Sequence, residues 1–187
     1  MKTKDLAYIA LFAAIIAVLG TLPAVNIGPV PLTAQTLGVM LAGSVLGARR
    51  GFLAVLLFLV LVAIGLPLLS SGAGGLAVFA GATAGYLYSW PVAAFVIGWL
   101  TERVWSRYNV AWGVVINVVG GMVVIYLIGV PVLAAVANLS LWEAVVSGAW
   151  PFLPGDAAKA FIAAAIADQV RRSYPVIERP QRAVATR

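Results

Sequence analysis

The stretch Pro151-Phe-Leu-Pro-Gly-Asp-Ala-Ala-Lys159 opens the last long apolar run of the chain, Ala160 to Ala167. It places an acid and a base at i and i+3 in a sequence that is 63% hydrophobic and only 10% charged. The Pro-Gly step within the stretch ends any preceding helix, so we expect Asp156 near the N-terminus of a new helix, where its negative charge suits the helix dipole. Residues at i and i+3 share one helix face, so Asp156 and Lys159 point to the same side.

Lys159 is the harder of the two residues to explain. A cation in the first turn opposes the helix dipole, and no other acid lies close to it in the sequence. The local pattern leaves two interpretations open. One is an ordinary Asp-Lys pair whose lysine reaches to water. The other is a site in which an anionic ligand completes the charge.

The composition identifies an integral membrane protein. The mean hydropathy is +1.06, and so apolar a chain has too little polar surface to cover a soluble core. The 187 residues include no Cys and no His, which removes thiol chemistry, imidazole bases and the usual zinc ligands. We therefore expect no metal, no cofactor and no catalytic residue. The net charge of +6 would suggest nucleic acid only if the basic residues formed one exposed face, but they separate apolar runs instead.

The apolar runs predict an all-α bundle of about six membrane spans, each long enough for a hydrocarbon core of ~30 Å. The first run follows two lysines, as a signal peptide would, but its length favours a retained span. We expect one membrane domain, residues 1–174, with spans at about 6–22, 33–48, 51–69, 86–104, 111–133 and 155–170, and a mobile basic tail over 175–187.

The basic residues are distributed asymmetrically over these spans. If the spans alternate in direction, Lys159 is the only one of the 12 Lys and Arg residues that does not fall on a single side. By the positive-inside rule that side is the cytoplasm. We therefore expect a protein of the prokaryotic cell membrane with both termini on the cytoplasmic side. The opposite loops, 20–31, 70–85 and 134–154, contain no Lys or Arg.

This topology places Asp156 and Lys159 near the outer face, beside the head of the second helix and the glycine-rich loop 70–85. Ionisable groups within a membrane usually face a cavity or a partner, which favours the ligand-site interpretation. The lysine would bind a carboxylate and the aspartate would accept from N–H donors, within an apolar pocket. A small, largely apolar acid with a polar head fits this description.

Three further features carry weaker signals. The loop 70–85 contains apolar residues that favour a folded loop over a flexible linker, and it lacks the ending of a phosphate loop. Asn117 within the fifth run predicts either helix packing, which we favour, or a ligand contact. The spacing of Ala10 and Ala14 allows close approach of another helix, but the spacing alone favours ordinary internal packing.

Three stretches together resemble the biotin-specific S component, BioY, of energy-coupling factor (ECF) transporters. They are Pro-Leu-Thr-Ala-Gln-Thr-Leu-Gly-Val-Met-Leu-Ala-Gly (31–43), Gly-Ala-Thr-Ala-Gly-Tyr-Leu (81–87) and Pro-Phe-Leu-Pro-Gly-Asp-Ala-Ala-Lys (151–159). The resemblance covers nearly the whole chain. It implies a six-helix membrane protein that captures biotin outside the cell and docks on a transmembrane coupling subunit driven by two ATPase subunits.

The resemblance also implies roles for single residues. Asp156 and Lys159 match the family's Pro-Gly-Asp-x-x-Lys motif and should supply polar contacts to biotin. The second motif departs from the family's Gly-Pro-Thr-Gly-Gly-Tyr-Leu, because Ala82 replaces the proline and Ala84 a glycine. The other implied ligand residues are Gln35, Thr83, Gly85 and Tyr86, with Asn117 kept as a candidate, and Ala10 and Ala14 are the implied contact with the coupling subunit.

Each alternative function requires sequence features that can be checked in this chain. The chain has no Walker motif, so ATP hydrolysis must belong to partner subunits. An S component for another small vitamin is the nearest alternative. A secondary transporter should show coupling carboxylates in repeated halves, and here only Asp156 is available. A membrane enzyme would need paired acids or a Ser/Lys dyad, so we expect no enzyme.

Overall fold

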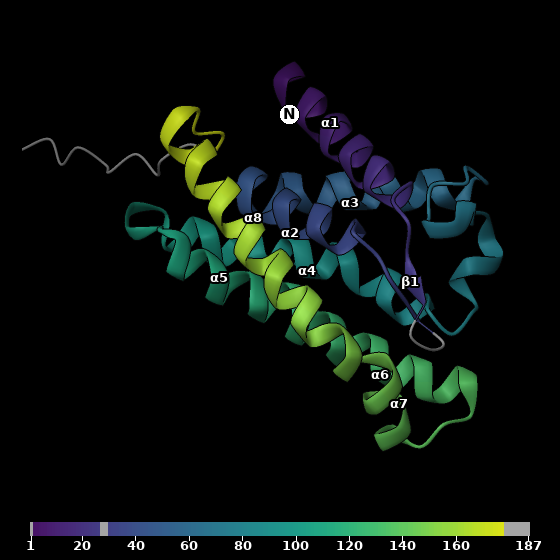
Figure 1. The fold of residues 1–187 in the computed structure, drawn as a ribbon. Coiled ribbons are helices and arrows are strands. Elements are labelled where there is room, and N and C mark those ends of the chain that lie inside the picture. The colour runs from purple at the N-terminus through teal and green to yellow at the C-terminus, as the bar shows by residue number, and fades with distance from the viewer. Residues whose placement is uncertain (1, 27–29, 178–187) are drawn as a thin grey trace, which may run out of the picture.

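Residues 2–26 and 30–177 of a computed structural model are described here, and they form an all-α bundle with one short hairpin (Figure 1). The expected tail beyond residue 177 lies outside the described residues. The helices are α1 (Thr3–Gly20), α2 (Gln35–Leu46), α3 (Ala48–Ala63), α4 (Ala84–Arg103), α5 (Val110–Val118), α6 (Ile125–Ala137), α7 (Leu141–Gly148) and α8 (Leu153–Ser173).

Short elements complete the chain. β1 (Val25–Asn26) pairs antiparallel with β2 (Pro31–Leu32) between α1 and α2. Four single turns lie in the connections: the 3₁₀ turns η1 (Ser70–Gly72), η2 (Leu76–Phe79), η3 (Trp105–Arg107) and η5 (Trp150–Phe152). The π-helical turn η4 (Val119–Val124) joins α5 directly to α6.

Helices lie on all six of the expected apolar runs, and the all-α expectation is confirmed. By length and composition, α1 and the continuous helix Val110–Ala137 are each apolar enough to cross a membrane. The second run differs from its expected span of 33–48, because α2 has only 12 residues, or about 18 Å of helix. A helix of that length leaves room between its first residue and the nearer end of the bundle.

The short helix α2 is the centre of the bundle. It packs against α1, α3, α4 and α8, and 10 of its residues are buried. The turn η4 approaches it closely, because a Cβ atom built on Gly121 would lie 2.4 Å from Cε of Met40. Glycine at this position therefore leaves room for the Met40 side chain of α2 against the π-helical turn.

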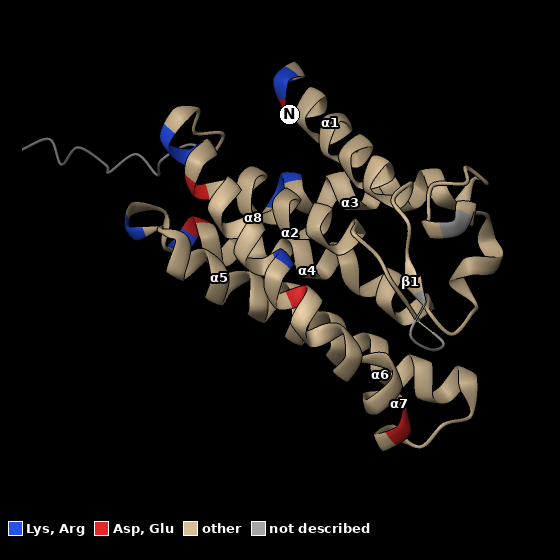
Figure 2. Ribbon diagram, viewed as in Figure 1, with Lys and Arg blue, Asp and Glu red and all other residues tan. Residues whose placement is uncertain are grey.

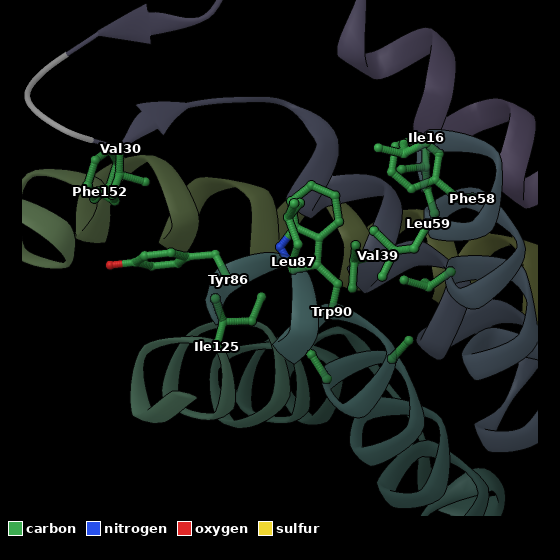
Figure 3. Packing of buried hydrophobic residues seen from close by; sticks show 14 of the residues in the cluster. Ile16, Val30, Val39, Phe58, Leu59, Tyr86, Leu87, Trp90, Ile125 and Phe152 are labelled. Atoms are coloured by element: carbon green, nitrogen blue, oxygen red, sulfur yellow. The ribbon is translucent and has the colours of Figure 1, made fainter. Parts of the chain in front are cut away.

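The core consists of two clusters of buried apolar residues, one in each half of the bundle. Figure 3 shows the cluster nearer the hairpin, in which Phe58 of α3 stacks on Trp90 of α4 with ring centroids 6.1 Å apart. Tyr86 and Phe152 belong to the same cluster. This half of the core surrounds the cavity described below.

The helix α7 begins at a capping box. Glu143 Oε2 accepts hydrogen bonds from the backbone N–H of Ser140 at 2.8 Å and from its hydroxyl at 2.7 Å. The Ser140 hydroxyl in turn accepts from the N–H of Glu143 at 3.3 Å, which satisfies two donors at the helix start. These bonds to the ionised carboxylate hold the pKa of Glu143 below its usual value.

Most of the charged positions lie at the end of the bundle where α1 begins and α8 ends (Figure 2). Arg50 Nε lies there 3.1 Å from Asp5 Oδ1, and Asp168 pairs with both Arg172, at 2.7 Å, and Arg171, at 3.8 Å. Lys159 lies apart from these pairs, near the start of α8, where its Nζ is 2.8 Å from Asp156 Oδ1. The Lys159 side chain lines the cavity described below.

Candidate functional site

A cavity of about 230 Å³ lies at the N-terminus of α2, in the space that this short helix leaves. The starts of α4 and α8 and the middle of the α5–α6 helix form its sides. The strand β2 and the segment between α3 and α4 also contribute to its wall. The lining residues are Val30, Pro31, Leu32, Thr33, Gln35, Thr36, Leu69, Ser70, Ala73, Val78, Gly81, Thr83, Tyr86, Leu87, Trp90, Ile125, Tyr126, Gly148, Phe152, Asp156 and Lys159.

The walls of this cavity are mostly apolar. Leu69 and Val78 come from the α3–α4 segment, Leu87 and Trp90 from α4, and Phe152 from η5. A space of this size accommodates a small organic molecule rather than a few water molecules. The charged groups in the lining are confined to α8.

Asp156 and Lys159 form a buried ion pair at one side of the cavity. Lys159 Nζ lies 2.8 Å from Asp156 Oδ1 and donates a second hydrogen bond to Thr36 Oγ1 at 3.0 Å. The Asp156 side chain is 7% exposed and that of Lys159 is 14% exposed. Because removal of one partner from a buried pair leaves an uncompensated charge, each side chain depends on the other.

Tyr126 completes the polar group. Its hydroxyl donates to Asp156 Oδ2, the carboxylate oxygen that Lys159 does not contact. Lys159 has thus used two of its three N–H donors, and each Asp156 oxygen has accepted one bond and can accept another. The site therefore offers a ligand one charged donor and two anionic acceptor positions.

Tyr86 lines the cavity with its ring, and its hydroxyl is bonded to the protein. The hydroxyl donates to the Gly148 carbonyl at 2.8 Å, which ties the end of α7 to α4. The ring lies against Gly129, where a built Cβ atom would come within 2.6 Å of it. Tyr86 thus has its one donor occupied. Thr83 lies next to it in the lining, as the residue before α4.

Gln35 also borders the cavity, as the sequence predicts, and its amide bonds to backbone groups of the protein. Its Nε2 group donates to the carbonyls of Leu68 at 3.1 Å and Ile16 at 3.4 Å. Its Oε1 atom accepts from the N–H of Ser70 at 3.3 Å. The sequence interpretation made Gln35 a ligand residue, whereas the structure pairs the polar atoms of its amide with two other segments of the chain, α1 and the connection between α3 and α4.

Two candidates of the sequence analysis do not line the cavity. Asn117 accepts a hydrogen bond from Ser44 Oγ at 3.1 Å and donates to the Gly113 carbonyl at 2.9 Å, which agrees with helix packing, the interpretation favoured above. Gly85 packs on α6, because a Cβ atom there would lie 2.5 Å from Cβ of Val132.

The predicted contact residues on α1 point outward. Ala10 and Ala14 are both exposed, together with Leu6 and Val18 on the same helix. The buried face of α1, which includes Ala13, packs on α2 and α3. The small residues therefore form part of a free apolar face.

Sequence reasoning missed three residues of the site. Thr36 follows Gln35 directly, and a threonine at the head of an apolar run could have been singled out with it. Tyr126 is a phenol within a long apolar run, where a polar group must find a partner. Trp90 gives no such signal, because an aromatic residue in a membrane helix is ordinary core material.

Comparison with known proteins adds an independent line of observation. The model of the BioY family matches residues 1–176. A biotin transporter BioY of Rhizobium etli is 50% identical over 95% of this chain and 98% of the relative. A second biotin transporter BioY, from Rhodobacter capsulatus, is 44% identical over 92% of this chain and 95% of the relative.

A solved structure shares the fold. The crystal structure of an S-component for biotin from an ECF-type ABC transporter superposes with a TM-score of 0.89 at 33% sequence identity. The match covers 94% of this chain and 97% of the solved one. The fold of this chain is therefore that of the solved S-component for biotin.

Proposed function

The chain belongs to the BioY family, and we propose that it is the biotin-binding and uptake subunit of an ECF-type transporter. The observation that carries the proposal is the buried Asp156–Lys159 pair, which faces an apolar cavity in a fold shared with a biotin S-component. The relatives named as biotin transporters cover nearly the full length of the chain, which supports the same ligand.

The chemistry of biotin is complementary to the groups in the cavity. Biotin has a carboxylate on an aliphatic chain and a ureido head with two N–H donors and one carbonyl acceptor. The remaining N–H of Lys159 suits either the carboxylate or the ureido carbonyl, and the acceptor positions of Asp156 suit the ureido N–H groups. The aliphatic chain and the thioether ring need apolar walls, which Leu87, Trp90 and Phe152 provide.

The proposal includes an orientation in the prokaryotic cell membrane. Most Lys and Arg positions lie at the end of the bundle where α1 begins and α8 ends, and by the positive-inside rule that end faces the cytoplasm, which puts both termini on the cytoplasmic side. The cavity then opens toward the outer face, where biotin is captured. The helices on the six apolar runs lie in the membrane. The short helix α2 reaches only part of the way across, because the cavity occupies the rest.

Energy for uptake comes from partner subunits. The chain has no nucleotide-binding motif, so we propose a transmembrane coupling subunit and two ATPase subunits, and no cofactor on this chain. The exposed face of α1 with Ala10 and Ala14 is the proposed contact with the coupling subunit, because small residues let two helices pack closely in a membrane.

Calorimetric titration of the detergent-purified protein tests the ligand. We expect saturable binding of biotin and none of thiamine or riboflavin, which are vitamins of different shape and charge. Binding of one of these vitamins instead of biotin would contradict biotin as the ligand and would leave the proposed membrane architecture unchanged. Asp156→Asn keeps the shape of the side chain and removes the charge, so it should weaken biotin binding while the protein stays folded.

A further inference from the structure

Residues 64–83, here called the wall segment, join α3 to α4 and close one side of the cavity. Leu69, Ser70 and Ala73 line the cavity from this segment. Seven backbone N–H groups between residues 64 and 75 donate hydrogen bonds to the segment itself or to α3, among them Leu69 N–H to the Ala73 carbonyl at 3.0 Å and Gly75 N–H to the Val62 carbonyl at 2.8 Å. None of these seven bonds reaches α1 or α2, so the position of the segment against those two helices depends on other contacts.

Gln35 supplies these contacts from the first residue of α2. One amide group reaches the wall segment twice, by donating to the Leu68 carbonyl and by accepting from the Ser70 N–H. It reaches α1 once, through the Ile16 carbonyl. The orientation of the amide is fixed by these neighbours, because the reversed group would point its oxygen at two carbonyl oxygens.

The end of α1 is shaped to permit this arrangement. A Cβ atom built on Gly20 would lie 2.3 Å from the Leu68 carbonyl oxygen and 2.8 Å from Gln35 Nε2. Any larger residue at position 20 would therefore push the wall segment and the amide away. The last turn of α1, the first turn of α2 and the wall segment meet here in direct contact.

The amide of Gln35 has no donor left for a ligand. Its two N–H groups are both bonded to backbone carbonyls, and the side chain is 1% exposed. We propose that Gln35 is a positioning residue, which holds the wall segment against α1 and α2 and so limits how fast biotin enters and leaves the cavity. The identity of the ligand rests on the function proposed above, whereas the role in holding the wall segment does not.

Hydrogen–deuterium exchange on the ligand-free protein tests this role directly. Gln35→Met keeps the length of the side chain and removes all three hydrogen bonds, so exchange over residues 66–75 should accelerate roughly tenfold. Gln35→Glu keeps an acceptor for Ser70 and loses the amide donors, so an intermediate acceleration is expected. Exchange in α4 and α8 should stay as in the wild type for both variants.

Ser89→Ala is the matched control. It removes a buried hydrogen bond of 2.6 Å, from Ser89 Oγ to the Tyr86 carbonyl, outside the wall segment and outside the cavity lining. It should leave exchange over 66–75 unchanged. If Gln35→Met slows or leaves unchanged the exchange of 66–75 in the ligand-free protein, or accelerates all helices equally, the positioning role is wrong.

Binding kinetics then connect the wall segment to the ligand. With biotin, Gln35→Met should raise the dissociation rate roughly tenfold without lowering the association rate, because a loosened wall opens more often. A lower association rate together with unchanged exchange would instead identify Gln35 as a ligand contact. If the wild-type protein fails to bind biotin, the proposed function fails, and the exchange experiment still decides the role of Gln35.

Discussion

Lys159→Met is the substitution that most clearly separates a ligand site from a structural ion pair. Methionine retains much of the aliphatic length of lysine and removes the ammonium group, which in the wild type lies 2.8 Å from Asp156 and 3.0 Å from Thr36. The cavity keeps its apolar walls and loses its only charged donor among the described lining residues.

The size of the effect follows from the bond that is lost. A hydrogen bond to a charged group contributes about 1.5–3 kcal/mol, and each 1.4 kcal/mol changes an equilibrium constant about tenfold. Biotin affinity of Lys159→Met should therefore fall by a factor of about 10 to 150. The assay is calorimetric or radioligand titration of the purified variant beside the wild type.

Two further variants make this result interpretable. Lys4→Met removes an exposed cation at the opposite end of the bundle and should leave affinity unchanged. The double variant Lys159→Met/Asp156→Asn removes the unpaired buried carboxylate, so it should regain part of the thermal stability lost in Lys159→Met without regaining affinity. A folded Lys159→Met protein with wild-type affinity would refute the reasoning.

The remaining predictions concern other residues of the site and the outer face of α1. Tyr126→Phe removes the donor to Asp156 and should weaken biotin binding about 2- to 13-fold in the same titration, and an unchanged affinity would separate this phenol from the site. Tyr86→Phe frees the end of α7 and should lower the free energy of unfolding by about 1 kcal/mol, which a denaturation curve measures; full wild-type stability would contradict it. Replacing Ala10 and Ala14 together with Leu should spare biotin binding and reduce co-purification with a coupling subunit, whereas undiminished co-purification would place that contact elsewhere.

The helices and the charged pair could be predicted because both depend on local sequence. Long apolar runs separated by basic residues indicate the bundle, and the i, i+3 spacing brings Asp156 and Lys159 to one helix face whatever surrounds them. The family resemblance, and not the local pattern, named Gln35, Thr83, Gly85 and Tyr86 as ligand residues. The structure brings all of these except Gly85 to the cavity lining.

The partners of these polar groups could not be predicted. Gln35 bonds a carbonyl 33 positions away, and Tyr86 bonds one 62 positions away, so neither contact leaves a local pattern. The Thr36 hydroxyl accepts a hydrogen bond from Lys159, 123 positions away, and this contact leaves no local pattern either. The sequence therefore predicts residues that border the cavity. It does not distinguish residues that contact a ligand from residues that bond to other segments of the chain.

The shortness of α2 was also hidden from the sequence. The run 33–48 is apolar enough to suggest a full span, whereas the helix begins only at Gln35, and a left-handed Gly47 separates its last residue from α3. Tertiary packing decides this, because the hairpin residues before Gln35 cover the cavity instead of extending the helix. The cavity lies beyond the first residue of α2, where a longer helix would continue.

A structure of the protein with biotin bound, determined in a lipid environment, tests the central claim most directly. The account predicts biotin within the cavity at the head of α2, with a polar atom of the ligand within hydrogen-bond distance of Lys159 Nζ and another of an Asp156 carboxylate oxygen. Biotin bound elsewhere on the protein, or in the cavity without contact to either side chain, would contradict it.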